Sequence, residues 1–137
     1  MATFKLNDEY TFSNGSSFIT SGGSDNTPAS LSSANGTDDQ NWNQQTSLSN
    51  GQLYCAAGFF LTGVAEQTPT CPINPPDTFW VVTDNGDDTV ILELMINNAS
   101  IGALENDNGS LKLKPKNGGN TQKWKFNKSP IKGPGHA

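Results

Sequence analysis

The sequence predicts an all-β protein in which one structural unit occurs three times along the chain. Three segments end on a tryptophan, and they are Gln40-Asn41-Trp42, Thr78-Phe79-Trp80 and Gln122-Lys123-Trp124. Apolar residues also recur 42 and then 40 residues apart, in the sets Ile19, Leu61, Ile101 and Leu31, Ile73, Leu113. A period of about 40 residues is a signature of repeat architectures. The repeat therefore indicates the overall architecture independently of any single residue.

The composition agrees with short strands joined by many turns. The chain has 137 residues, with 14 Gly and 8 Pro, and 33% of its residues are hydrophobic. Such a chain can bury one modest core, so we expect a single domain over residues 1–137. Within it the repeats are expected at about 9–50, 51–86 and 87–127, followed by a loose C-terminal tail at 128–137.

The first two repeats each predict four strands. Those of the first repeat are expected at residues 10–12, 17–20, 29–32 and 42–46, and those of the second at residues 52–56, 59–63, 70–73 and 79–83. Asn14-Gly15 lies between the first two strands, and an Asn-Gly pair in that position is a strong hairpin signal. Ala57-Gly58 forms the corresponding turn in the second repeat, while Asn50-Gly51 and Asp84-Asn85-Gly86 end the tryptophan strands.

The third repeat predicts strands at residues 89–94, 99–103, 110–113 and 122–126. Apolar residues alternate with Lys or Gln in the last two, so Trp124 and Phe126 are predicted to point into the core. From the second apolar residue of each repeat to the tryptophan the chain takes 11, 7 and 11 residues, which predicts a shortened loop in the second repeat. No segment predicts a helix.

The three units are expected to close on one another. None can bury its apolar face alone, so the tryptophan strands must share one core. Closure around a pseudo-threefold axis removes most exposed strand edges, as in a barrel. The sequence therefore predicts a β-trefoil of twelve short strands.

The tryptophan motif resembles that of the ricin-B-like (R-type) lectins, whose trefoil repeats end on Gln-x-Trp. Two copies keep Gln-x-Trp, and Thr78 replaces the Gln in the other. Glu9-Tyr10-Thr11-Phe12-Ser13-Asn14 and Leu61-Thr62-Gly63 resemble the strand openings of small cytosolic fungal members, and the resemblance covers residues 9–127. It implies a carbohydrate-binding lectin or agglutinin for the terminal sugars of glycans, such as galactose or N-acetylgalactosamine. It also implies that Trp42, Trp80 and Trp124 are structural core residues.

The resemblance directs the search for sugar contacts to three positions in each repeat. Family sites use an Asp just after a strand that ends in an apolar residue, an aromatic on the next loop, and an Asn before the Gln. The residues matching the Asp are Thr20, Thr62 and Gly102, and those matching the Asn are Asp39, Asp77 and Thr121. Other polar loop residues are expected to bind carbohydrate: Asp25, Asn26 and Asp39 in the first repeat, and Asn106, Asp107 and Asn120 in the third. The second repeat, with Pro75 and Pro76, is expected to lack a site.

Catalysis and metal binding are not expected. The only histidine is His136, in the predicted tail, and no Ser or Cys has a base supplied by a sequence motif. Asp84-Asn85-Gly86-Asp87-Asp88 lacks the spaced Glu of an EF-hand and is interpreted as turn chemistry. The sequence therefore predicts a protein that is not an enzyme, with no cofactor and no metal.

The charges are divided along the chain. All thirteen acidic residues lie at or before Asp107 and seven of the eight basic residues at or after Lys112, so residues 1–111 carry −12 and residues 112–137 carry +7. We expect these charges to meet across the closed fold. The absence of Arg argues against phosphate recognition, so no nucleic-acid partner is predicted.

The remaining expectations concern location and alternatives. The chain shows no signal-peptide pattern and no apolar run of 18 residues, which predicts a cytoplasmic or non-classically secreted protein without membrane insertion. Cys55 and Cys71 are expected to be buried free thiols. The sequence leaves open whether the protein forms a homodimer.

The alternative function is a β-trefoil protease inhibitor that would insert the Pro-containing loop at 67–76 into a protease.

Overall fold

Short antiparallel strands dominate the computed structural model, which describes residues 4–5, 8–45, 51–74 and 76–128. These residues form thirteen strands and two 3₁₀ helices. The strands are β1 Tyr10–Asn14, β2 Ser17–Thr20, β3 Thr27–Pro28, β4 Ser30–Ser32, β5 Trp42–Gln45, β6 Gln52–Cys55, β7 Phe59–Phe60, β8 Thr70–Cys71, β9 Phe79–Asp84, β10 Thr89–Ile96, β11 Ala99–Asp107, β12 Ser110–Lys114 and β13 Trp124–Lys128. The 3₁₀ helices are η1 Asp38–Gln40 and η2 Asn120–Gln122.

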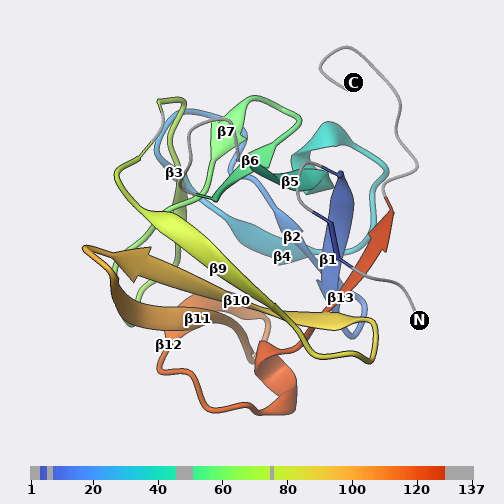
Figure 1. Ribbon diagram of the computed structural model, residues 1–137. Coiled ribbons are helices and arrows are strands. Elements are labelled where there is room, and N and C mark those ends of the chain that lie inside the picture. Colours follow the sequence, from blue (N-terminus) through green and yellow to red (C-terminus); the bar gives the residue numbers. More distant parts are fainter. Residues whose placement is uncertain (1–3, 6–7, 46–50, 75, 129–137) are drawn as a thin grey trace.

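The sheet curls round so that the last described strand meets the first. Its order is β12-β11-β10-β13-β1-β5-β6-β7, with β2 and β4 extending from β1 and β9 pairing with β10. β13 pairs with both β1 and β10, and Figure 1 shows β1 and β13 side by side. This curled antiparallel sheet is a β-trefoil.

All twelve predicted strands are present, and β3 is an additional strand of two residues that pairs with β8 of the second repeat. The described residues contain no α-helix, as predicted, and the two 3₁₀ turns η1 and η2 are additional. The strand β13 extends to Lys128, where the tail was expected to begin. The rest of that tail, with His136, lies outside the described residues, as do Pro75 and the turn at Asn50. The repeat boundaries at residues 50 and 86 stay a prediction.

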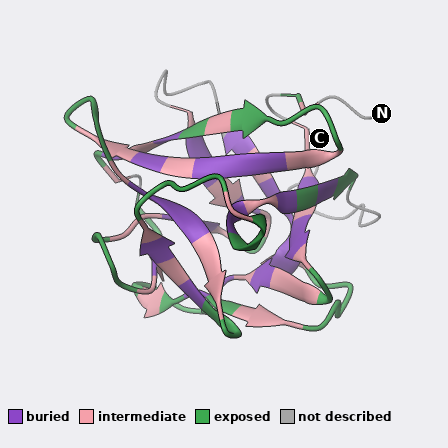
Figure 2. Ribbon diagram, turned by 90° about the horizontal axis from the view of Figure 1, so that it is seen from below, coloured by how far each residue is buried: buried purple, intermediate pink, exposed green. Residues whose placement is uncertain are grey.

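The three motif tryptophans lie in the core, as predicted. Trp42, Trp80 and Trp124 are at most 2% exposed. In Figure 2 the buried residues lie along the strands, and the exposed residues lie mainly in the turns at the periphery. Each indole N–H donates a hydrogen bond to a backbone carbonyl of the same repeat. The acceptors are Ile19 (3.0 Å), Leu61 (2.9 Å) and Leu104 (3.0 Å).

These hydrogen bonds correct two of the predicted repeat positions. Leu104, and not Ile101, takes the place of Ile19 and Leu61. Cys71, and not Ile73, takes the place of Leu31, because the chain at Cys71 turns back beside Leu61 while Ile73 is 53% exposed. The interval from this position to the tryptophan in the second repeat is therefore nine residues, from Cys71 to Trp80, and the loop is shortened by less than predicted.

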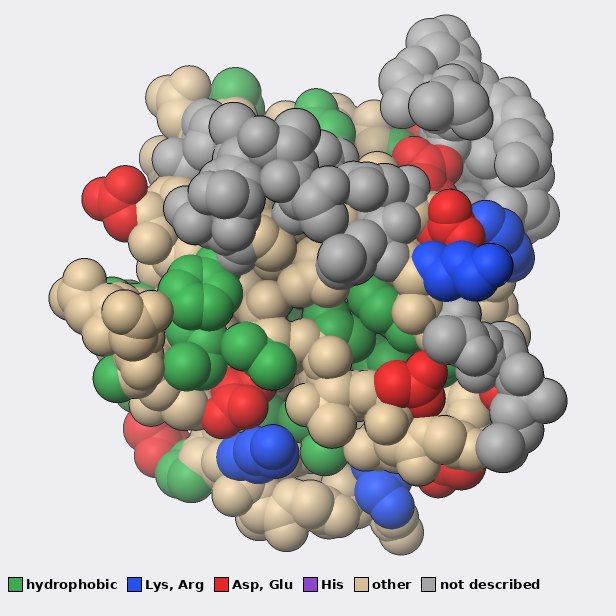
Figure 3. All heavy atoms as spheres, in the orientation of Figure 1, with side chains coloured by type: hydrophobic (Ala, Val, Ile, Leu, Met, Phe, Trp, Pro, Cys, Tyr) green, Lys and Arg blue, Asp and Glu red, His purple; other side chains and the backbone are tan. Residues whose placement is uncertain are grey.

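The charges meet across the fold, as expected. Four ion pairs among the described residues each join a lysine after residue 111 to an acidic residue before it: Lys114 to Glu66 (3.3 Å) and Asp107 (4.0 Å), Lys116 to Glu93 (3.7 Å) and Lys128 to Asp8 (3.0 Å). On the face in Figure 3, lysine and carboxylate side chains lie interspersed among neutral polar groups. This arrangement leaves no single-sign patch on that face.

Candidate functional site

A buried glutamine organises the loop before the tryptophan in the first and third repeats. In the first, the Asn35 N–H donates to Gln40 Oε1 (3.0 Å), and in the third the Asn117 N–H donates to Gln122 Oε1 (2.9 Å). Each Asn is followed by a glycine with positive φ, 68° at Gly36 and 71° at Gly118, a conformation that glycine adopts without strain. The pattern Asn-Gly-x-x-x-Gln-x-Trp therefore builds the same loop twice.

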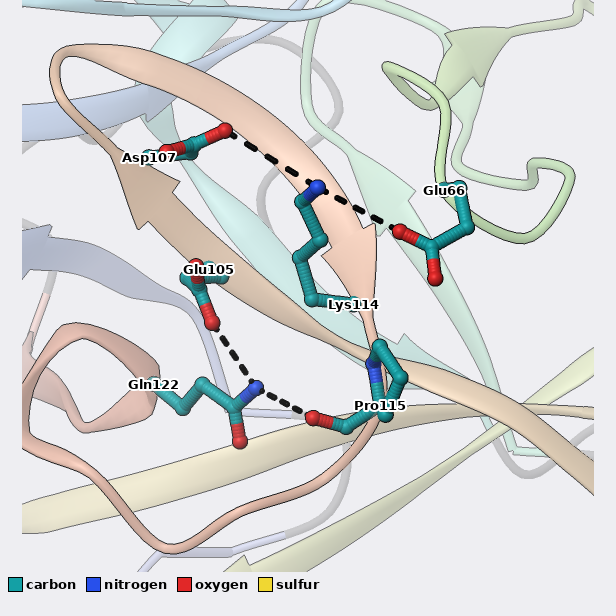
Figure 4. Close-up of polar contacts among 6 residues, drawn as sticks. All are labelled: Glu66, Glu105, Asp107, Lys114, Pro115 and Gln122. Carbon is teal, nitrogen blue, oxygen red and sulfur yellow. Dashed lines mark hydrogen bonds and ion pairs between the residues drawn. The ribbon is translucent and has the colours of Figure 1, made fainter.

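The partners of the glutamine amide group differ between these two repeats. Gln40 Nε2 donates to Thr20 Oγ1 (3.1 Å), Ser32 Oγ (3.2 Å) and the Ser33 carbonyl (2.9 Å), which are all neutral groups. Gln122 Nε2 donates to the Pro115 carbonyl (2.9 Å) and to Glu105 Oε1 (3.0 Å), as Figure 4 shows. The third repeat thus holds a carboxylate where the first repeat holds a hydroxyl.

Glu105 occupies the position at which the family resemblance expects an acidic residue. It directly follows Leu104, the residue whose carbonyl accepts the Trp124 indole hydrogen bond. Glu105 was not among the predicted residues, because Gly102 was expected at this position. The sequence does contain a signal for Glu105. In each repeat two apolar residues precede one polar residue, in the segments Phe18-Ile19-Thr20, Phe60-Leu61-Thr62 and Ala103-Leu104-Glu105.

The carboxylate of Glu105 is fixed on one side and open on the other. Gln122 is fully buried, whereas Glu105 is half-buried on the outer face of β11. Among the described residues, Gln122 is the only group that hydrogen-bonds to Glu105, and it uses Oε1. The second oxygen, Oε2, is therefore available to accept hydrogen bonds from a ligand.

The second repeat lacks this arrangement. Thr78 replaces the glutamine, and its hydroxyl is 2.7 Å from that of Thr62, the residue that corresponds to Glu105. The two hydroxyls satisfy each other inside the loop. No carboxylate occupies this position in the second repeat.

The lysines near Glu105 are partly engaged with other acids. Lys112 is the cross-strand neighbour of Glu105 on β12. Lys114, two residues further on, extends between Asp107 and Glu66, so the loop of the second repeat is linked to the third repeat (Figure 4). Glu105 therefore lies on a surface that carries charges of both signs.

The structure brings the predicted residues of the third repeat close to η2. The Asn106 amide donates to Asn14 Oδ1 (3.1 Å), and the Asn14 amide donates to the carbonyl of Asn120 (2.8 Å). Asn106 Oδ1 also accepts from the Gly109 N–H (2.8 Å), so its side chain has a structural role in the turn. The side chain of Asn120 is exposed and has no hydrogen bond within the described chain, and Asp107 is paired with Lys114.

The predicted residues of the first repeat are used to hold backbone and buried groups. Asp25 Oδ1 accepts from the Ile73 N–H (2.8 Å), and the Asn26 N–H donates to the Cys71 carbonyl (3.0 Å). Asp39 Oδ1 accepts from the buried Ser21 hydroxyl. These contacts tie the first repeat to the second and satisfy a buried donor.

The described residues offer neither a metal cluster nor an activated nucleophile. No group of three His, Cys, Asp or Glu side chains is placed to hold a metal ion in the part of the chain that is described. Cys55 and Cys71 are buried free thiols, as expected. Burial raises the pKa of Cys55 to about 12 and also raises the pKa of Cys71, so both stay protonated at neutral pH.

The acidic turn at residues 84–88 is held by hydrogen bonds of its own. Asp84 Oδ1 accepts from the Gly86 N–H (2.9 Å), and Asp87 Oδ1 accepts from the hydroxyl and the N–H of Thr89. The bond from the Thr89 hydroxyl is the main reason that the pKa of Asp87 is lowered. These contacts agree with the interpretation of this segment as a turn.

The loop proposed for a protease inhibitor is held against the rest of the protein. Thr70 and Cys71 form β8 and pair with β3, and the Ile73 N–H is bonded to Asp25.

None of the helices formed by the described residues is long and apolar enough to cross a membrane.

Solved structures similar to this one are β-trefoil proteins. The designed threefold-symmetric protein ThreeFoil matches with a TM-score of 0.70 and 18% identity, over 86% of this chain and 96% of its own. SeviL bound to asialo-GM1 saccharide matches with a TM-score of 0.67 and 19% identity, over 89% of this chain and 98% of its own. The β-trefoil lectin of the Vibrio vulnificus hemolysin/cytolysin, with N-acetyl-D-lactosamine bound, matches with a TM-score of 0.69 and 18% identity, over 91% of this chain and 97% of its own.

No protein-family model and no curated protein sequence matches the chain. At such low identities the structural matches establish the fold and not the ligand.

Proposed function

We propose that the protein is a lectin that binds the terminal sugars of glycans or glycoconjugates, with its main site at Glu105 in the third repeat. The observation that carries the proposal is the pairing of the half-buried Glu105 with the buried Gln122, which leaves Oε2 without a hydrogen-bond partner among the described residues. Galactose and N-acetylgalactosamine are the first ligands to test. No chemical step is proposed, because the site holds an acceptor for hydrogen bonds and no nucleophile with a base.

The geometry around Glu105 suits the recognition of sugar hydroxyls. A hydrogen bond from a hydroxyl to a charged carboxylate is roughly twice as strong as one between neutral groups. Because Gln122 already orients the carboxylate, little conformational freedom is lost when a ligand binds. Asn120 and Asp107 are proposed as further contacts from η2 and the end of β11, with Asn106 supporting them through the turn.

The first-repeat residues stay a weaker prediction. Asp25, Asn26 and Asp39 each make a contact that the fold itself uses. Their loss would therefore disturb structure as well as any sugar contact. The neighbouring lectins of the same fold, two of them solved with a saccharide, support carbohydrate binding in general.

A glycan array probed with wild type and Glu105→Gln tests the proposal. Gln at this position can still accept the Gln122 hydrogen bond but lacks the charge, so we expect an unchanged melting temperature and binding weakened about tenfold or more. Glu93→Gln is the matched control, because Glu93 is a half-buried acid on the neighbouring strand that pairs with Lys116. Absence of binding to every glycan would refute the function, and full binding by Glu105→Gln would refute the site.

A further inference from the structure

A pocket of about 350 Å³ lies beside the loop at residues 34–37, in the first repeat. It shares no residue with the cluster around Glu105. Its walls are the strands β1, β2 and β13 on one side and the loop on the other, with the lining residues Thr11, Phe18, Ala34, Gly36, Thr37, Gln40, Asn41, Asn127 and Lys128. The pocket is therefore separate from the Glu105 site.

Strand pairing explains why Thr11, Phe18 and Asn127 reach this pocket together. Thr11 pairs with Asn127 across β1 and β13, so their side chains lie on the same face. The next pair, Phe12 with Phe126, is buried in the core on the opposite face. Phe18 pairs with Ser13, two residues after Thr11, and so lies on the same outer face as Thr11.

Two polar side chains of the pocket have no partner in the described structure. The Thr11 hydroxyl and the Asn127 amide make no hydrogen bond to any described residue. The Gln40 amide is fully engaged by the loop, and Lys128 is held by Asp8 and by the ring of Tyr10. Thr11 and Asn127 therefore offer a hydroxyl and an amide beside the aromatic residue Phe18, with no carboxylate among the lining residues.

The third repeat carries different side chains at the corresponding positions. There Ala103 takes the place of Phe18, since it pairs with Glu93 as Phe18 pairs with Ser13. Lys116, which corresponds to Ala34, forms an ion pair with that Glu93 (3.7 Å). The first repeat instead combines Phe18 with a neutral residue at each of these positions, and the space stays open.

We propose that this pocket is a second carbohydrate site, for one neutral hexose unit. The apolar C–H face of the sugar would lie against Phe18, and its hydroxyls would bond to Thr11 and Asn127. The volume is within the range of small-molecule sites, which are mostly apolar with a few polar groups that fix orientation. The ligand class rests on the proposed lectin function, although the site is different.

NMR titration of the backbone amides tests this site separately from Glu105. The full chain is titrated with galactose, N-acetylgalactosamine, glucose, mannose and N-acetylglucosamine. We expect at least one sugar to shift the amides of Thr11, Phe18, Thr37 and Asn127 in a saturable way. Thr11→Val and Asn127→Ala should each weaken this binding about five- to tenfold, the effect of one lost hydrogen bond, and Glu105→Gln should leave it unchanged.

The control and the opposing outcomes distinguish the two proposals. Thr83→Val removes a similar hydroxyl from an exposed strand position outside the pocket and should change nothing. Shifts confined to the neighbours of Glu105, or pocket binding that survives both Thr11→Val and Asn127→Ala, would overturn the second site and leave the lectin function intact. If no amide responds to any sugar or to a glycan, both proposals fail.

Discussion

The side chains that define each repeat act through single hydrogen bonds to the backbone. Each motif tryptophan fills the core and also donates its indole N–H to a backbone carbonyl in the second strand of its own repeat or, for Leu61, directly after that strand. A buried carbonyl without a partner costs about 1–3 kcal/mol, so the indole contributes through both its volume and its donor. This explains why another large apolar residue would not replace tryptophan without cost.

Trp124 allows these two contributions to be separated. We expect Trp124→Phe to lower the free energy of unfolding by about 1–3 kcal/mol, mainly because the Leu104 carbonyl loses its donor. Trp124→Ala also leaves a large cavity and should cost about 3–5 kcal/mol. Chemical denaturation of the three proteins measures the difference, and equal stability of Trp124→Ala and wild type would show that this side chain is not in the core.

Cys55 should make the protein sensitive to alkaline pH. Burial raises its pKa from an ordinary value of 9.0 to about 12, so above pH 9 the unfolded chain releases the thiol proton while the folded chain retains it. Stability linked to this group is complete below pH 9 and declines as pH rises towards 12. Melting temperatures between pH 8 and 11 should fall more steeply for wild type than for Cys55→Ser, whose hydroxyl can still donate to the Asp38 carbonyl. Parallel curves would contradict this.

At the level of elements, irregularities in the strands caused the main errors of prediction. In the β10–β11 hairpin, Leu94 pairs with Gly102 but Met95 pairs with Ser100, so Ile101 is the extra residue of a β-bulge. The alternation of apolar residues changes phase at that point. The sequence prediction matched Ile101 to Leu61 at a spacing of 40 residues, whereas the equivalent residue, Leu104, is 43 residues from Leu61. The site prediction therefore reached Gly102 in place of Glu105.

The features that were predicted correctly depend on local chemistry. Asn14-Gly15 forms the expected hairpin, and the alternating pattern correctly placed Trp124 and Phe126 in the core. The pairing of β3 with β8 was missed because it joins two repeats and has no local sequence signal. The pocket beside Phe18 was missed for the same reason, since Asn127 is more than a hundred residues away from Thr11 in the sequence.

Replacement of Gly102, beside the bulge, by a residue with a Cβ should destabilise the protein strongly. Its φ is 145°, and a Cβ there would lie 2.9 Å from the Lys114 carbonyl oxygen on the adjacent strand. We expect Gly102→Ala to lower the free energy of unfolding by about 3 kcal/mol or more. Gly118→Ala is the control, because its φ is also positive but the space around it is open, and it should cost only about 1 kcal/mol. Equal losses measured by denaturation would show that the contact with Lys114 is unimportant.

At the level of the whole molecule, the core repeats while the periphery does not. The indole hydrogen bonds are the same in all three repeats, but the residue that follows the acceptor is Thr20, Thr62 or Glu105. Only the last is charged. The three lobes can therefore share one stable framework and still differ in what they bind.

Glycan binding should not require a divalent metal. The described residues hold no cluster of metal ligands, and the acidic turn at 84–88 uses its carboxylates for local hydrogen bonds. We expect the affinity measured by calorimetry to be the same in EDTA and in millimolar Ca²⁺. Loss of binding in EDTA with recovery in Ca²⁺ would place a metal in the site.

The position of β13 also has a consequence for how the chain is made. This strand pairs with β10 and also with β1, and the pairing with β1 joins residues more than a hundred positions apart. During synthesis β1 can pair with β2 and β5, but the edge of β1 that meets β13 must stay unpaired until residue 128 has left the ribosome. Folding of the trefoil should therefore finish only after residue 128 has been synthesised, at a rate limited by these distant contacts. Until then the nascent chain exposes apolar strands that aggregate unless a chaperone covers them.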